Sequence, residues 1–257
     1  GADAVLAASI FHYGEFTVAQ AQQPEFLALY RGASPSSDFA FNWKKEAAPR
    51  TQLAGRLWWE IPKSEFSTGG MDRLFAGFSS AVTGELTMGQ LYRYQIESPS
   101  LPQIYGLPLT DDGVREATRR ATYIREMFGR YFMTASRSDD VNIAVAFQAA
   151  LWEIVNEAEF PDKPAPFSLF TGTFQANYGQ RADSPAYVQQ AEKYLESLTG
   201  NDVEAFYENT AVTGRELIHL RALKIEKPVS TEGAEATPNG DTPKGATPMP
   251  CLLYTSD

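Results

Sequence analysis

A glutamine in the middle of an apolar helix is the feature that most restricts how this chain can fold. Residues 141–155 carry Ala, Val and Leu at spacings of three and four, the pattern of an α-helix with one buried stripe. Gln148 lies on that stripe. Leaving one polar group of a buried carboxamide without a hydrogen bond costs about 1–3 kcal/mol. The fold must therefore bring a hydrogen-bonding partner to Gln148.

The sequence upstream of this helix has the pattern of a β-region. Phe39, Phe41 and Trp43 alternate with small or polar residues, as in a strand with one buried face. Clusters of Gly, Pro and Ser separate this pattern from its neighbours. The predicted strands are residues 26–30, 37–43, 53–61 and 91–97.

The pattern then becomes helical. Amphipathic helices are predicted at 110–132, 138–159 and 184–198, with Asp139 or Asp140 as the N-cap of the second and Pro161 at its end. A last strand pattern, 215–227, is long enough to rejoin the sheet. We therefore expect an α+β fold: an antiparallel β-unit, sandwich or barrel-like, with a helical insertion and a final strand that returns to the sheet.

Charge and hydropathy exclude several partners. The 257 residues include 32 acidic and 22 basic ones, without a run of Lys or Arg. Such a chain lacks the positive field that nucleic acid or an anionic lipid surface requires. No stretch approaches the roughly 20 apolar residues of a membrane span. We expect no nucleic-acid partner and no membrane insertion within this sequence.

The composition changes abruptly after residue 227. Residues 228–250 are rich in Pro, Thr and Gly and contain no aromatic residue, which predicts an extended Pro/Thr linker. Cys251 begins the final run, CLLYTSD. This peptide matches the translation of a transposon-end adapter used in preparing sequencing libraries. We interpret residues 251–257 as adapter-derived and the sequence as a metagenomic fragment; a natural tail is the alternative. The rest of the chain is cysteine-free, which excludes disulfides and thiolate metal sites from it.

Two motifs resemble those of the thioester domains of bacterial surface proteins. They are Tyr94-Gln95-Ile96-Glu97 and the helix motif FQAALWEI at 147–154. The resemblance covers roughly residues 26–226 and is greatest to a divergent branch in secreted proteins with C-terminal sorting signals. It defines a module at 26–227, preceded by an N-terminal segment, 1–25, of uncertain role.

In that family a strand cysteine condenses with the helix glutamine, and the resulting internal thioester acylates a nucleophile on a neighbouring surface. Gln148 matches this glutamine, and Trp152 and Glu153 match the residues that follow it. Gln95 occupies the position of the cysteine. Because a thioester requires a thiolate sulfur, the resemblance implies a module without the covalent reaction. A sequencing error at a natural cysteine is one explanation, although Cys and Gln codons differ at two or more bases.

Two hypotheses account for Gln148. Alternation along residues 91–97 places Gln95 on the face shared with Arg93 and Glu97, which in the family meets the helix. The carboxamides of Gln95 and Gln148 would then exchange two hydrogen bonds, each contributing about 1 kcal/mol. The alternative is an ordinary core glutamine bonded to the main chain.

The sequence offers two further candidate sites. Glu153 and Glu157 have the spacing of an acid/base pair for glycoside hydrolysis, but solvated helix charges are the simpler interpretation. Trp58, Trp59 and the tyrosines of 91–97 fit either a sugar-binding platform or the core.

The sequence therefore predicts a non-enzymatic, secreted or cell-surface module that acts in adhesion or structure. It predicts no catalytic residue, metal or cofactor, and the two histidines, His12 and His219, have no partner residues for catalysis nearby in sequence. The expected partner is a cell-surface protein or glycan. The alternative function is a carbohydrate-binding or glycoside-hydrolysing domain.

Overall fold

The computed structural model describes most of the expected module. Its described residues are 25–43, 48–62, 74–82, 86–97, 100–158, 167–179, 181–200, 217–223 and 252–255. The linker at 228–250, almost all of the segment 1–25, and Pro161 lie outside them.

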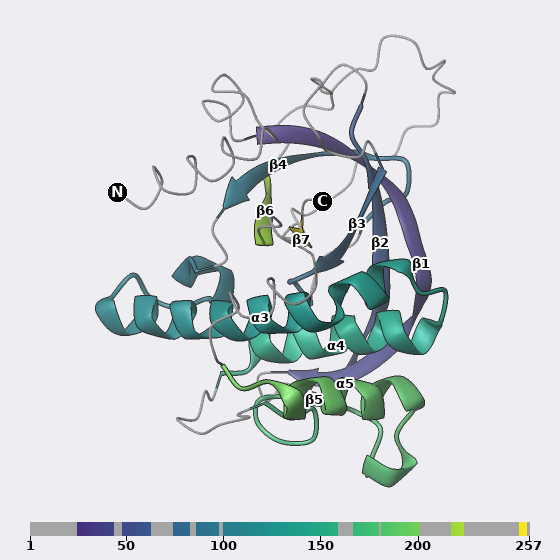
Figure 1. The fold of residues 1–257 in the computed structure, drawn as a ribbon, viewed down its shortest axis with the longest axis vertical. Helices are drawn as coiled ribbons and strands as arrows, with labels where there is room; N and C mark the ends of the chain where they lie inside the picture. Colours follow the sequence, from purple (N-terminus) through teal and green to yellow (C-terminus); the bar gives the residue numbers. More distant parts are fainter. Residues whose placement is uncertain are drawn as a thin grey trace.

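The strands form one antiparallel sheet that curls and closes on itself (Figure 1). The sheet order is β2-β3-β7-β6-β4-β1-β5, and β1 also pairs with β2, which completes the ring. Every pairing is antiparallel. The strands are β1 (Glu25–Trp43), β2 (Arg50–Glu60), β3 (Leu74–Ser79), β4 (Leu91–Glu97), β5 (Phe174–Ala176), β6 (Leu217–Leu223) and β7 (Leu252–Thr255).

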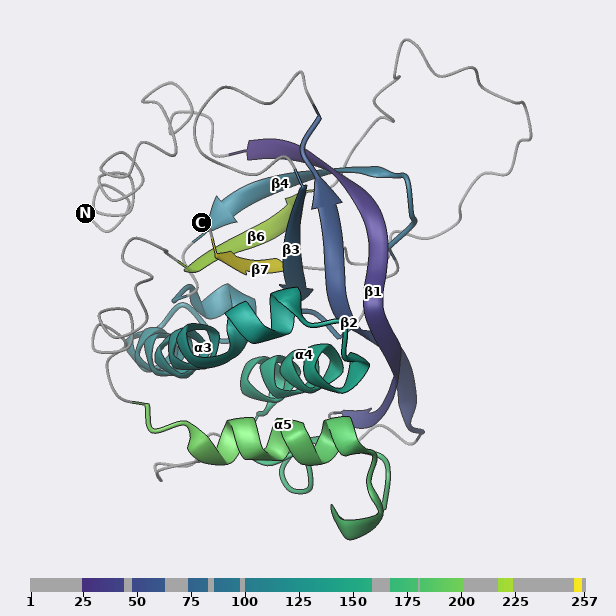
Figure 2. The same ribbon diagram turned by 45° about the vertical axis from the view of Figure 1, so that its right-hand side comes forward.

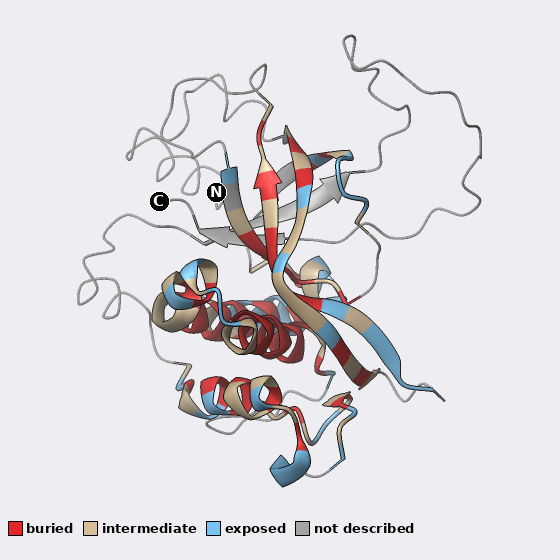
Figure 3. Ribbon diagram, turned by 90° about the vertical axis from the view of Figure 1, so that its right-hand side faces the viewer, coloured by how far each residue is buried: buried red, intermediate tan, exposed pale blue. Residues whose placement is uncertain are grey.

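Three α-helices lie together against one end of the curled sheet (Figure 2). They are α3 (Asp111–Arg137), α4 (Val141–Asn156) and α5 (Ala186–Ser197), with the short 3-10 helices η1 (Pro102–Tyr105) and η2 (Arg181–Asp183) beside them. α4 lies between α3 and α5 and also packs on β1 and β2. Every residue of α4 from Ala144 to Val155 is consequently buried (Figure 3).

The helix boundaries follow from local chemistry. Thr110 Oγ1 accepts a hydrogen bond from the Gly113 N–H at 3.3 Å at the start of α3. Asp140 Oδ1 accepts the Asn142 N–H at 2.8 Å, which identifies Asp140 as the N-cap of α4. α4 ends at Asn156, before the predicted stop, because the Glu157 main chain turns to an extended conformation. The predicted end at Pro161 was therefore too late.

The α+β prediction is confirmed, with changes in the strands. Two strands predicted at 26–30 and 37–43 form the single long strand β1, which contains register shifts around the cis Ser34–Pro35 bond. The predicted final strand corresponds to β6, which pairs with β4. β3 was not predicted, because LFAGFS is short and contains Gly77 in place of a clear alternation.

Three of the four aromatic residues proposed as a sugar platform, Trp59, Tyr92 and Tyr94, belong to the core. Trp59 is fully buried, with its ring centroid 5.8 Å from that of Tyr92 and 5.1 Å from that of Tyr94, both edge-to-face. Trp58 is half-buried and donates its indole N–H to the Ser34 carbonyl at 3.0 Å. These contacts bear out the core interpretation. Among the helices described, none is long and apolar enough to cross a membrane.

Candidate functional site

Gln148, the glutamine matched to the thioester motif, is bonded to the main chain of the last residue of β3. Its side chain lies in the middle of α4 and the residue is 1% exposed. Oε1 accepts the Ser79 N–H at 2.9 Å, and Nε2 donates to the Ser79 carbonyl at 2.6 Å. Gln148 and Ser79 each satisfy one donor and one acceptor in this way. These hydrogen bonds offset the cost of burying the carboxamide.

The carboxamide takes the place that a neighbouring strand would occupy. β2 and β3 pair as far as Leu57 and Gly77. Ser79 lies two residues beyond Gly77, so its N–H and C=O lie past the last residue of β3 that is in register with β2. Gln148 meets these groups with the same donor and acceptor that a peptide unit carries. A helix side chain thus continues the hydrogen bonding where strand pairing stops.

Two further side chains of α4 bond the residues that follow β3. Trp152 Nε1–H donates to the Ala81 carbonyl at 3.1 Å. Asn156 Nδ2 donates to the Ser80 carbonyl at 3.5 Å and to the Trp152 carbonyl at 2.9 Å. Gln148, Trp152 and Asn156 recur every four residues and so lie along one side of α4. We call these three residues the α4 polar row.

The sequence did not identify Ser79, Ser80 and Ala81 as partners of this row. The available signal was a short apolar run ending in two serines, which predicts a turn but not its tertiary neighbour. Ser79 Oγ also accepts the Ala81 N–H at 3.2 Å and donates to the Ala81 carbonyl at 3.0 Å. The turn is therefore held by the Ser79 hydroxyl as well as by the α4 polar row.

The second residue matched to the thioester motif, Gln95, lies in β4 in register with Glu25 and Arg221. Its side chain lies outside the description, so hydrogen bonding between Gln95 and Gln148 stays a prediction. Arg93, expected on the same strand face, is exposed, whereas Tyr92 and Tyr94 are buried. For Gln148 itself, the alternative of a core glutamine bonded to the main chain is confirmed.

The interpretation of Glu153 and Glu157 as solvated charges was wrong. Glu153 is 1% exposed and Glu157 is 3% exposed, and Glu192 of α5, also 1% exposed, joins them. They are buried because residues 167–174 fold over α4 and α5 and donate main-chain N–H groups to all three carboxylates. Sequence periodicity places a side chain on a helix face but cannot show that a later loop covers it.

Glu157 makes the most hydrogen bonds to this loop. Its carboxylate accepts the Thr173 N–H at 2.7 Å, the Thr173 hydroxyl at 2.8 Å and the Phe174 N–H at 3.2 Å. Gly172, at φ +89°, lets the chain approach so closely that a Cβ there would lie 2.1 Å from Glu157 Oε2. The glycine is required both by its backbone angle and by this contact.

Glu153 and Glu192 bond the first part of the loop. Glu153 Oε1 accepts the Ser168 N–H at 3.2 Å, while Glu192 accepts the Leu169 N–H and, at 3.2 Å, the Ser168 hydroxyl. Burial raises the pKa of Glu153 well above the ordinary glutamate value, and the nearby charge of Glu157 raises it further. Burial also raises the pKa of Glu192.

A buried arginine bonds the C-terminal end of α4, beside Glu153 and Glu157. Arg120, 1% exposed, donates from Nη1 to the carbonyls of Ile154 at 3.0 Å and Val155 at 3.3 Å. Its Nε and Nη2 bond Glu116 Oε1 at 2.9 and 2.7 Å. The cation satisfies carbonyls in the last turn of α4, where positive charge is favoured.

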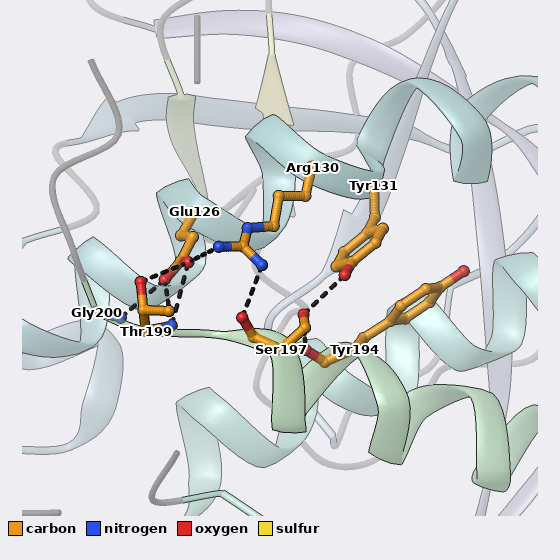
Figure 4. Close-up of polar contacts among 7 residues, drawn as sticks. All are labelled: Glu126, Arg130, Tyr131, Tyr194, Ser197, Thr199 and Gly200. Carbon is orange, nitrogen blue, oxygen red and sulfur yellow. Dashed lines mark hydrogen bonds and ion pairs between the residues drawn. The ribbon is translucent and has the colours of Figure 1, made fainter. Parts of the chain in front are cut away.

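A fourth buried carboxylate, that of Glu126, joins α3 to the chain after α5 (Figure 4). Glu126 accepts the main-chain N–H groups of Thr199 at 2.9 Å and Gly200 at 2.8 Å, and pairs with Arg130 at 2.5 Å. Arg130 also donates to the Ser197 carbonyl at 2.6 Å. The buried acids of α3, α4 and α5 therefore all accept hydrogen bonds from main-chain N–H groups of connecting segments.

The buried polar side chains of this arrangement form hydrogen bonds with the protein's own main chain. Within the described ranges, no group of three or more His, Cys, Asp or Glu side chains could hold a metal ion. His219 lies in β6, paired with Glu97 of β4, and His12 lies outside the description. No known protein-family model matches the sequence, and no solved structure matches the fold.

Proposed function

We propose that this protein is a non-enzymatic structural or adhesive module of the bacterial cell surface, built like a thioester domain but held together without the covalent bond. The observation that supports this function is the state of Gln148. Its carboxamide is buried, and its oxygen and nitrogen are both bonded to the main chain of Ser79. The side chain serves as a non-covalent connection between α4 and the sheet.

The chemistry of the matched positions agrees with this role. To form a thioester, a thiolate must attack the glutamine carbonyl and displace ammonia. Gln95, at the cysteine position, carries an amide, which is not a nucleophile under ordinary conditions. Trp152 and Glu153, the remaining motif residues, bond Ala81 and Ser168 and so support packing around the same helix.

Location and partner are part of the proposal. A secreted or surface-displayed module suits the Pro/Thr composition of the linker at 228–250. The net charge of −10 disfavours anionic polymers as partners and is compatible with a protein or glycan on another cell surface.

Intact-mass measurement before and after treatment with methylamine tests the chemistry. We expect the mass calculated from the sequence and no change with the amine, because Gln148 keeps its nitrogen. A mass lower by one ammonia, followed by gain of one methylamine, would contradict the proposal. A reactive thioester domain treated in parallel shows that the conditions detect the reaction.

Cell binding tests the adhesive part. The purified protein should bind to cell surfaces and be released completely by denaturant, since no covalent bond forms. A Gln148→Ala variant that still folds should bind as well as the wild type. Turnover of a glycoside would instead favour the alternative of a hydrolase, and saturable binding on a glycan array would favour a carbohydrate-binding domain.

A further inference from the structure

We propose that Glu153, Glu157 and Glu192 form a carboxylate latch over residues 167–174. The latch holds these residues against α4 and α5 while Glu153 carries a proton, and it loosens when all three carboxyl groups are charged. The inference is independent of the proposed function. It rests on where the three carboxylates lie and on what each of them bonds.

The latch joins two helices to one loop. Glu153 and Glu157 come from α4 and Glu192 from α5. Together they accept main-chain N–H groups at both ends of the loop, from Ser168 and Leu169 and from Thr173 and Phe174. The loop leads directly into β5, which pairs with the end of β1. If the loop loosens, the pairing of β5 with the end of β1 should therefore weaken as well.

Glu153 is the member whose charge is least compensated. Its Oε2 atom is buried and has no hydrogen-bond partner among the described residues, and only one N–H is donated to its Oε1. Glu157 accepts hydrogen bonds from three donors in residues 168–174. Glu192 accepts from two donors, the Leu169 N–H and the Ser168 hydroxyl, which lies within reach of both carboxylate oxygens. A buried carboxylate with so few donors is more stable with a proton.

The charged groups around Glu153 come from three helices. Glu157 follows it on α4 and Glu192 faces it from α5, and both raise the pKa of Glu153, whereas Arg120 of α3 lowers it. Arg120 is already engaged by Glu116 and by the last carbonyls of α4. The positive charge of Arg120 is thus shared among several acceptors. The pKa of Glu153 is therefore set mainly by burial and by the charges of Glu157 and Glu192, which raise it.

The charged groups around Glu192 are less buried. Arg181 of η2 lowers the pKa of Glu192, and Glu196 of α5 raises it. These two residues pair with each other on the surface, where water screens their effect. Glu153 is therefore the member whose ionisation decides the state of the latch.

Hydrogen exchange tests the latch. After correction for intrinsic exchange, protection of the Ser168 and Leu169 amides should fall about tenfold or more between about pH 5 and about pH 9. Glu153→Gln keeps the acceptor for Ser168 and cannot ionise, so its protection should stay constant over this range. Glu196→Gln, the same change on the exposed face of α5, should retain the wild-type pH dependence.

Two outcomes would overturn the latch: constant protection in the wild type, or the same decrease in Glu153→Gln. If Glu153→Gln does not fold, titration of the Glu153 carboxyl carbon by NMR in the wild type decides the matter. Ionisation in the ordinary range of an exposed glutamate would contradict the proposal, and ionisation at higher pH that accompanies the loss of protection would support it.

Discussion

Gln148 of α4 and Ser79 of β3 are joined by two hydrogen bonds, of 2.9 and 2.6 Å, between one side-chain carboxamide and one residue's main chain. The two residues are 69 positions apart, and the contact lies between the central helix and the sheet. Because both partners are buried polar groups, removing the carboxamide takes one hydrogen bond from each main-chain group of Ser79.

Gln148→Leu should therefore destabilise the protein by about 2–4 kcal/mol, since the Ser79 N–H and C=O would both lose their partner in the interior. The free energy of unfolding from urea denaturation measures the effect. Gln103→Leu, on the exposed side of η1, should change stability by less than about 0.5 kcal/mol. Equal effects of the two substitutions would mean that water reaches Ser79.

Replacing Arg120 tests how much its hydrogen bonds to the last turn of α4 stabilise the protein. Arg120→Met removes a buried cation and leaves the carbonyls of Ile154 and Val155 without their donor. We expect a loss of about 2–4 kcal/mol in the free energy of unfolding. Arg115→Met, which removes an exposed ion pair with Asp112, should cost less than about 1 kcal/mol.

A pair of glycine substitutions separates backbone strain from steric contact. Gly172→Ala introduces a Cβ 2.1 Å from Glu157 Oε2 at φ +89°, whereas Gly179→Ala, at φ +77°, meets nothing within 4 Å. Strain at positive φ costs about 1–2 kcal/mol in either variant. Gly172→Ala should lose additional stability, and the difference between the two melting temperatures reports the Glu157 contact alone.

The pH dependence of stability follows from Glu153. Its pKa is raised in the folded state, so the folded protein binds more protons than the unfolded chain above the ordinary glutamate range. The contribution of this group is fully present below the unfolded pKa and is lost as pH rises through the folded pKa. Glu153→Gln should therefore unfold at a higher denaturant concentration than the wild type at alkaline pH. A wild-type advantage there would contradict this sign.

Replacing Glu126 tests how the chain after α5 is held against α3. Glu126→Gln keeps an acceptor for Thr199 and Gly200 but removes the charge that pairs with Arg130. Charge-assisted hydrogen bonds are roughly twice as strong as neutral ones, so we expect a loss of about 1–3 kcal/mol. Amide exchange at Thr199 and Gly200 should accelerate, while exchange at Ser168 should remain unchanged.

The sequence by itself determined the helices, most of the strands and the burial of Gln148. Periodicity of three and four residues defines α4, and an aspartate at 139 or 140 marks its start, because these features depend on neighbours within a few residues. The same local rules placed the alternating aromatics of β1 in strands. They also required a hydrogen-bonding partner for Gln148 without naming it.

Only the tertiary structure decided which partner that is and which charges are buried. Ser79 meets Gln148 because β2–β3 pairing stops at Gly77 and leaves main-chain groups for a helix to bond. Glu153 and Glu157 have the spacing of solvated charges, but the loop at 167–174 covers them. Both outcomes depend on contacts between segments distant in sequence, whose energies no local pattern records.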